Sequence, residues 1–94
     1  MLRIERTAQF KRDYKRELKG RHRKTVEDDL RAVLMMLVNC ESLEEKYRDH
    51  ALTGNWKDHR DCHIKPDLVL IYSIPETGDT LRLARLGSHS QLGL

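Results

Sequence analysis

Apolar residues recur with helical spacing in the first half of this 94-residue chain. The first stripe repeats every fourth residue: Phe10, Tyr14 and Leu18. We predict that this helix begins after Thr7, whose side chain caps it, and ends near Gly20. The second stripe is longer: Val26, Leu30, Val33, Leu34, Leu37 and Val38. It predicts a helix that begins at Thr25, with Asp28 as the partner in a weak capping box.

The remaining apolar segments have the pattern of strands. Four strands are expected: 2–6, 60–64, 68–72 and 80–86. Pro66 lies in a tight turn before the third strand, and Gly87 ends the last one, leaving a short tail or helix that contains His89. The order β-α-α-β-β-β predicts a single α+β domain over residues 1–94, in which an antiparallel sheet carries two helices packed on one face.

Composition narrows the class of protein. The longest uninterrupted apolar run, Ala32 to Val38, is far shorter than the roughly 20 residues that cross a bilayer. Charges interrupt the amino terminus where a signal peptide would be apolar. Cys40 and Cys62 lack C-x-x-C spacing and are expected to be small buried side chains. We therefore expect a cytoplasmic protein that does not contact a membrane.

Positive charge is concentrated at the amino terminus. Residues 1–24 carry ten Lys and Arg against three Asp and Glu, whereas residues 25–94 carry eight against twelve. The basic segment favours a polyanion as partner, although a solvated helix face has the same pattern. The Phe, Tyr and Trp residues are too few for a platform on which several bases stack.

Histidines gather in the second half of the chain. Four of the five lie there among aspartates: His50, His59, His63 and His89. Strand alternation puts Asp61 and His63 on the same face of the sheet, and we expect the helices to cover the other face. Arg85 and His89 follow the adjacent strand edge. An uncovered face that holds imidazoles, a carboxylate and a guanidinium is suited to phosphodiester chemistry.

Cleavage of RNA without a metal requires three groups. A base takes the proton of the 2′-OH, an acid protonates the departing 5′-oxygen, and a cation holds the charge that develops around phosphorus. Histidine performs either proton transfer near neutral pH, each typically worth about 10²–10⁴-fold. Arginine presents a fixed fork of donors to phosphate oxygens.

Two other interpretations of the histidines stay open. In the first interpretation, the imidazoles lie on the surface without a function or make structural hydrogen bonds. The second is a zinc site built from His59, Cys62 and His63, with His50 as a further ligand. Zinc is disfavoured because positions i and i+4 of a strand lie about 13 Å apart, too far to share one ion.

Two motifs are similar to one family of proteins. Residues 49–67 follow the pattern D-H-x-L-x-G-x-W-K-x-x-R-D-x-H-I-x-P-D, and residues 85–89 read R-L-G-S-H. They resemble the YafQ branch of the RelE/ParE toxin superfamily. The resemblance covers residues 44–92, whereas residues 1–40 agree only in layout. It implies a RelE-like fold and the toxin of a bacterial type II toxin–antitoxin system.

The activity implied by the resemblance is that of a ribosome-dependent endoribonuclease, an mRNA interferase that cuts translated mRNA without a metal or other cofactor. The implied partners are a cognate antitoxin, which neutralises the toxin, and the 70S ribosome with its mRNA. The implied catalytic residues are His50, His63, Asp67 and His89. Arg85 would be a phosphate ligand in the transition state.

Roles within this set are assigned as follows. We expect His50 or His63 to act as the base and His89 as the acid. Asp67 would then orient an imidazole or share the base role. The chain ends without the aromatic residue that helps the site in the family toxin. Charge and the ribosome are therefore expected to hold the RNA.

Four further residues have assignments of their own. Lys57, Arg60 and Lys65 are candidates for RNA contact, or for a solvated surface. Trp56 is expected to plug the core between the sheet and a loop.

Two other functions stay open: a ParE-like toxin that inhibits DNA gyrase by binding, without nuclease activity, and an RNA- or protein-binding module without catalysis. The paired histidines argue against the gyrase inhibitor, which does not need them.

Overall fold

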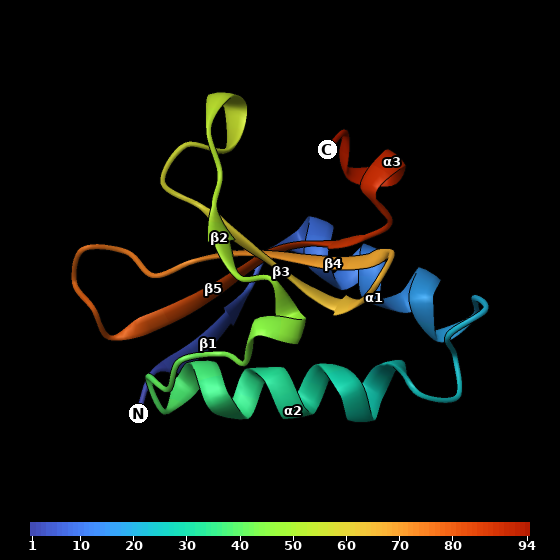
Figure 1. Ribbon diagram of the computed structural model, residues 1–94, viewed down its shortest axis with the longest axis horizontal. Helices are drawn as coiled ribbons and strands as arrows, with labels where there is room; N and C mark the ends of the chain where they lie inside the picture. The colour runs from blue at the N-terminus through green and yellow to red at the C-terminus, as the bar shows by residue number, and fades with distance from the viewer.

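Five strands form one sheet in the computed structural model, which describes residues 1–94 (Figure 1). In chain order the elements are β1 (Arg3–Arg6), α1 (Ala8–Leu18), α2 (Val26–Val38), β2 (His50–Ala51), β3 (Arg60–Lys65), β4 (Leu68–Ser73), β5 (Thr80–Gly87) and α3 (His89–Leu92). Two short 3-10 helices, η1 (Glu45–Tyr47) and η2 (Gly54–Trp56), flank β2. The α+β class is confirmed, as are the four predicted strands and the two predicted helices.

The sheet is mixed rather than wholly antiparallel. Its strand order is β1-β5-β4-β3-β2, and β1 pairs with β5 in parallel, with Ile4 opposite Leu81. The other three pairs are antiparallel. The predicted antiparallel sheet is therefore wrong for β1. Parallel neighbours need a long crossover, and here the chain between β1 and β5 includes both long helices and three strands.

The main core lies between the sheet and the two long helices. The helices contribute six buried side chains: Phe10, Val26, Leu30, Val33, Leu37 and Val38. The strands contribute Cys62, Ile64, Leu68, Leu70, Tyr72, Leu81, Leu83 and Leu86. The two predicted helical stripes are confirmed except at Leu18, which is exposed at the end of α1.

The opposite face of the sheet carries a smaller apolar cluster. Its buried members are Val69, Ile71, Ala84 and Leu92, and Leu52 and Trp56 pack against them. Trp56 reaches this cluster from η2, so its predicted role as a plug between sheet and loop is confirmed. Every residue of β4 is buried, because this second cluster covers the face that the long helices leave free.

One predicted helix cap is confirmed and the other is wrong. The Phe10 N–H donates to Thr7 Oγ1 at 3.0 Å, and the same hydroxyl donates to the Ala84 carbonyl at 2.9 Å. Thr25 makes no side-chain cap, so the predicted capping box is absent. Its N–H donates to the His22 carbonyl instead, which makes α2 the continuation of a turn.

The two cysteines have different surroundings. Cys62 is buried in the main core, as predicted, but Cys40 is exposed, and the prediction is wrong there. Cys40 lies beyond the end of α2 with a left-handed backbone (φ 58°), so it is outside the buried stripe of that helix. No helix of the structure is both long enough and apolar enough to cross a membrane.

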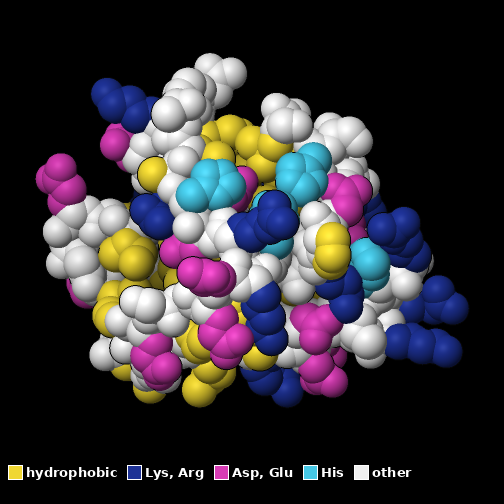
Figure 2. Space-filling view, viewed as in Figure 1, with side chains coloured by type: hydrophobic (Ala, Val, Ile, Leu, Met, Phe, Trp, Pro, Cys, Tyr) yellow, Lys and Arg dark blue, Asp and Glu magenta, His cyan; other side chains and the backbone are white.

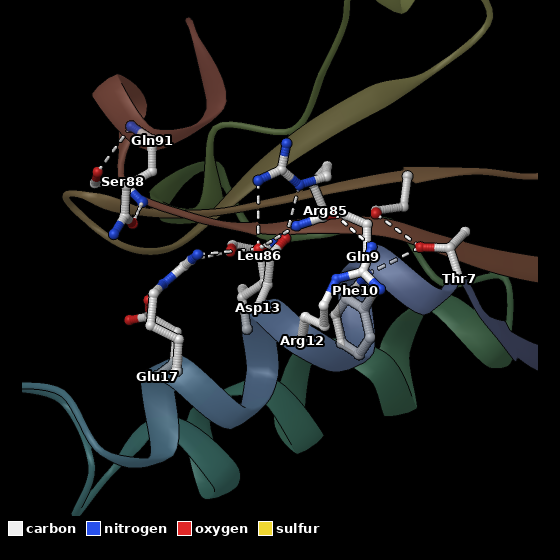
Figure 3. Close-up of polar contacts among 12 residues, drawn as sticks. Thr7, Gln9, Phe10, Arg12, Asp13, Glu17, Arg85, Leu86, Ser88 and Gln91 are labelled. Carbon is white, nitrogen blue, oxygen red and sulfur yellow. Dashed lines mark hydrogen bonds and ion pairs between the residues drawn. The ribbon is translucent and has the colours of Figure 1, made fainter.

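α1 lies beside β5 and completes the hydrogen bonding of that strand (Figure 3). The Leu86 N–H donates to Asp13 Oδ2 at 3.0 Å, and Arg16 Nη2 donates to the Leu86 carbonyl at 2.7 Å. Asp13 is fully buried. The helix therefore satisfies the edge of β5 with a carboxylate and a guanidinium where another strand would have done so with its backbone.

Candidate active site

The face of the sheet opposite the long helices carries the predicted imidazoles. On β3, Cys62 and Ile64 belong to the helix-side core, so the alternating residues Asp61 and His63 face the other way, as the strand parity predicted. Figure 2 shows several histidines on one side of the molecule, beside Lys and Arg side chains. Three histidines, from β2, β3 and α3, meet aspartates or one another there: His50, His63 and His89.

His63 and His89 are direct neighbours. Their ring centroids lie 5.0 Å apart, with the planes inclined by 67°. Partial burial lowers the pKa of His63, and the charges of His89 and other nearby cations lower it further against the opposing effect of Asp61. His63 is therefore neutral at pH 7, with one ring nitrogen free to accept a proton.

Asp67 holds His89 through two hydrogen bonds. Its Oδ1 accepts from His89 Nδ1 at 2.7 Å and from the His89 N–H at 3.0 Å. These bonds lower the pKa of Asp67, which stays ionised. Because the carboxylate takes the hydrogen of Nδ1, Nε2 is left for a ligand. A capping box between Ser88 and Gln91 fixes the start of α3 at the same point.

His50 is oriented by two acceptors on one nitrogen. Its Nδ1 lies 2.8 Å from the Arg48 carbonyl and 3.1 Å from Asp61 Oδ1. Both neighbours accept hydrogen bonds, so Nδ1 carries a hydrogen, and Nε2 is the nitrogen left for a ligand. The hydrogen-bond geometry favours the carbonyl, which leaves Asp61 Oδ1 buried without a donor.

Asp61 is a site residue that the sequence analysis did not select. It is 3% exposed, and burial raises its pKa, although the charges of the three imidazoles pull the pKa down. Strand parity had already put Asp61 on the same face as His63, and that was the signal that could have found it. A buried carboxylate with an unpaired oxygen beneath three imidazoles is a typical feature of functional sites.

Asp13 binds the predicted phosphate ligand, Arg85 (Figure 3). Arg85 Nε and Nη2 donate to Asp13 Oδ2 and Oδ1 at 2.8 and 3.3 Å. Burial raises the pKa of Asp13, but the hydrogen bonds from Arg85 and from the Leu86 N–H lower it by more. Arg85 thus gives two of its donor nitrogens to a carboxylate, and Nη1 makes no hydrogen bond within the chain.

Two of the three RNA-contact candidates take part in ion pairs. Arg60 Nε lies 3.2 Å from Asp49 Oδ1, a hydrogen bond that raises the pKa of Arg60. Lys65 pairs with Asp29 of α2. Lys57 is exposed and takes part in no ion pair. Arg60 and Lys65 therefore tie elements of the fold together, whereas Lys57 is free.

A cavity of about 800 Å³ opens beside His63 and His89. Other residues that line it come from α2, from the η1 segment, from the end of β3 and from the turn after it: Asp29, Lys46, Tyr47, Arg48, Lys65 and Pro66. The sequence analysis did not select the η1 residues, although they directly precede the D-H motif. The cavity makes the two imidazoles accessible to a ligand much larger than water.

The alternative zinc ligands are not brought together. No group of three or more His, Cys, Asp or Glu side chains is arranged to hold a metal ion. His59 packs edge-on against Trp56 with 5.1 Å between ring centroids, whereas His63 packs against His89. Cys62 lies in the helix-side core, where burial raises the pKa of its thiol.

Proton transfer is the chemistry that this arrangement supports. His50, His63, Asp67 and His89 are brought together, with hydrogen bonds that fix the orientation of two rings. Arg85 is held by Asp13 of α1, a contact that joins residues 72 positions apart, and it does not line the cavity of His63 and His89. One neutral imidazole and one imidazole bound to a carboxylate provide different environments for a base and an acid.

Curated relatives align with the chain. A family model described as the bacterial toxin of type II toxin–antitoxin system, YafQ, matches residues 2–93. The mRNA interferase toxin YafQ of Escherichia coli K12 is 38% identical over 90 residues, which cover 95% of this chain and 92% of that protein. The putative toxin YafQ of Haemophilus influenzae is 53% identical over 60 residues, and this alignment spans 62% of this chain but only 59% of that protein.

Solved structures match over nearly the whole chain. A metal-bound toxin from Helicobacter pylori is 43% identical with a TM-score of 0.87, covering 98% of this chain and 99% of that one. YafQ in the E. coli DinJ–YafQ complex is 34% identical with a TM-score of 0.82, covering 98% of each chain. The resemblance carried by the D-H and R-L-G-S-H motifs is thereby confirmed, and the protein belongs to the YafQ family of toxins from bacterial type II toxin–antitoxin systems.

Proposed function

We propose that this protein is an endoribonuclease that cleaves mRNA during translation and is held inactive by an antitoxin. The observation that carries the proposal is the pair of neighbouring imidazoles, His63 and Asp67-bound His89, at the mouth of a large cavity. The name of the E. coli relative, mRNA interferase toxin, supports the same activity. Family membership supports the ribosome as the site of action.

In the proposed mechanism His63 is the base and His89 the acid. The free nitrogen of His63 takes the proton of the 2′-OH, and the 2′-oxygen attacks phosphorus. The bond to the 5′-oxygen breaks as His89 gives that oxygen a proton from Nε2, leaving a 2′,3′-cyclic phosphate. His50, fixed by Arg48 and Asp61, is the alternative base. Each proton transfer is typically worth about 10²–10⁴-fold.

Arg85 is proposed to stabilise the charge on the transferring phosphate through the nitrogen that Asp13 does not occupy. Preorganised donors of this kind need no rearrangement during the reaction. Asp13 also fixes the guanidinium, because two of its oxygens bind two of the arginine nitrogens. Every step of this mechanism is performed by side chains of the chain, so the proposed reaction does not depend on a metal.

The antitoxin is proposed to be DinJ-like, because the E. coli relative forms a complex with DinJ. An apolar groove of about 430 Å³ between β1, α1 and α2 is the surface best suited to it. Ile4 and Met35 line the groove with 47% and 52% of their surface exposed. An exposed apolar groove beside an edge strand is suited to a partner that adds a helix or a strand.

The docking of the antitoxin is tested by Met35→Glu, which puts a charge into the groove. We expect this variant to keep its toxicity while the antitoxin loses the ability to suppress it. Ile74→Glu is the matched control, because Ile74 is exposed to a similar degree outside the groove. Equal suppression of both variants would place the antitoxin elsewhere.

Mapping of mRNA 5′ ends after brief induction tests the enzymatic function. New ends within translated messages are expected for the wild type and are lost in His63→Ala and His89→Ala. Arrest of growth with intact transcripts and damaged DNA would instead support the ParE-like inhibition of gyrase. Expression without any growth defect would support a binding module without catalysis.

A further inference from the structure

One cation in the wall of the large cavity has no counter-charge within the chain. Arg48 lies in the cavity wall with His63 and His89, is exposed, and takes part in no ion pair. The two lysines of the same wall are engaged: Lys65 with Asp29, and Lys46 at 3.9 Å from a neighbouring glutamate. Arg48 is therefore the cation of this wall that is ready to bind an anion.

The backbone holds Arg48 next to the site. The residue has a left-handed conformation (φ 49°) that ends η1, and its carbonyl lies 2.8 Å from His50 Nδ1. The following residue, Asp49, accepts hydrogen bonds from Tyr72 at 2.6 Å and from Arg60 at 3.2 Å. Because the carbonyl of Arg48 and the side chain of Asp49 are both held, the side chain of Arg48 starts from a fixed point beside the imidazoles.

Arg48 and Arg85 are in different states. Arg85 donates from Nε and Nη2 to buried Asp13, whose carboxylate is the counter-charge of the guanidinium. Arg48 keeps all five of its N–H donors and its full charge for a ligand. An RNA strand carries one negative charge per nucleotide, so a strand whose scissile phosphate lies at His63 and His89 brings further phosphates into the adjoining cavity.

We propose that Arg48 binds the RNA phosphate that directly flanks the scissile one, in the cavity between η1 and the turn after β3. This inference rests on the proposed nuclease function and adds a substrate-binding subsite to it. Arginine suits the site because its planar fork meets two phosphate oxygens at once. The contact orients the RNA strand and carries no information about base sequence.

The first test compares single-turnover cleavage by four proteins on ribosomes programmed with a short mRNA whose cut site has been mapped. Arg48→Ala is expected to slow cleavage at subsaturating enzyme about tenfold, the scale of one hydrogen bond to a charged group. Arg48→Lys keeps the charge without the fork and is expected to be intermediate. Arg82→Ala is the matched control, since Arg82 is a half-exposed arginine paired with Glu5, outside the cavity.

The second test removes the charge from the RNA instead of the protein. A methylphosphonate replaces each phosphate beside the scissile one in turn. At one of these linkages the wild type is expected to lose the same factor as Arg48→Ala, and the variant is expected to lose nothing further. Equal losses in both proteins at every linkage, or an unchanged rate for Arg48→Ala, would overturn the contact. Failure of the wild type to cleave unmodified message would overturn the nuclease function itself.

Discussion

Replacing Asp61 with asparagine is expected to make the protein more stable and less active. Asp61 is 3% exposed, and its buried Oδ1 lacks a hydrogen-bond donor. Asparagine has the same shape, and its amide oxygen can take the position 3.1 Å from His50 Nδ1. The substitution removes a buried negative charge without opening a cavity, so the desolvation penalty of the ionised carboxylate disappears.

The expected size of the gain follows from two opposing effects. An unsatisfied buried group costs about 1–3 kcal/mol, and the attraction of nearby positive charge, which lowers the pKa of Asp61, offsets part of this cost. We expect a net gain of about 1 kcal/mol at pH 7, which for a chain of this length raises Tm by about 4–8 °C. Because burial raises the pKa of Asp61, the ionised carboxylate lowers the stability of the wild type above the folded pKa. Below the unfolded pKa of about 3.9 the carboxyl is protonated in both states, and this cost is absent.

The difference in stability between Asp61→Asn and the wild type should therefore be present at pH 7 and vanish below pH of about 4. Thermal unfolding followed by circular dichroism measures it, with Asp28→Asn as the control at an exposed aspartate. Cleavage should fall about tenfold, because a charge facing three imidazoles is lost. A lower Tm for Asp61→Asn at pH 7 would refute the reasoning, since it would mean that the carboxylate stabilises the fold.

Three further outcomes are expected. Asp13→Asn should lower the free energy of unfolding by about 3 kcal/mol in a denaturant titration, because Arg85 loses its buried counter-charge. Since folding lowers the pKa of Asp13, its charge should stabilise the fold above the unfolded pKa of about 3.9, and this stabilisation should be lost as pH falls through the folded pKa. A difference in stability between Asp13→Asn and the wild type that is unchanged at lower pH would contradict this. The acidic limb of the cleavage rate should lie below the ordinary histidine pKa of about 6.5, because burial lowers the pKa of His63; a limb above that value would exclude His63 as the base. Cleavage of ribosome-bound mRNA should survive the addition of a chelator specific for transition metals to the assay. Loss of cleavage, with recovery when one metal is added back, would refute the metal-free mechanism.

The sequence was sufficient for those features that depend on local periodicity. The stripe from Val26 to Val38 and the alternation around His63 each repeat over several residues, so helix, strand and face could be predicted together. β2 could not, because His50–Ala51 is too short to show a period. The cap at Thr25 failed because the backbone before α2 forms a turn that supplies its own acceptor, the His22 carbonyl.

The contacts that define the state of the site are long-range, and no local pattern predicts them. Arg85 meets Asp13 across 72 positions, so its resemblance-based role as a phosphate ligand gave no indication that a carboxylate already occupies two of its nitrogens. The expectation that Asp67 orients an imidazole did not say which one, and its hydrogen bond to His89 depends on how α3 leaves β5. Arg48 was missed because only the folded chain brings η1 against the turn after β3.

Three aspartates around the site have different roles because they differ in burial and in hydrogen-bond partners. Asp13 is buried and fully bonded, its pKa is lowered, and it joins α1 to β5 through Arg85. Asp61 is buried, its Oδ1 has no hydrogen-bond donor, and its pKa is raised. The groups that lower the pKa of Asp61 are imidazoles. Asp67 is exposed and accepts from both the N–H and the ring of His89, and its lowered pKa keeps this acceptor ionised beside the proposed acid. Asp61 is thus the aspartate whose burial is not compensated by a hydrogen bond, and it is also the one that faces the imidazoles, which is the combination expected of a functional carboxylate.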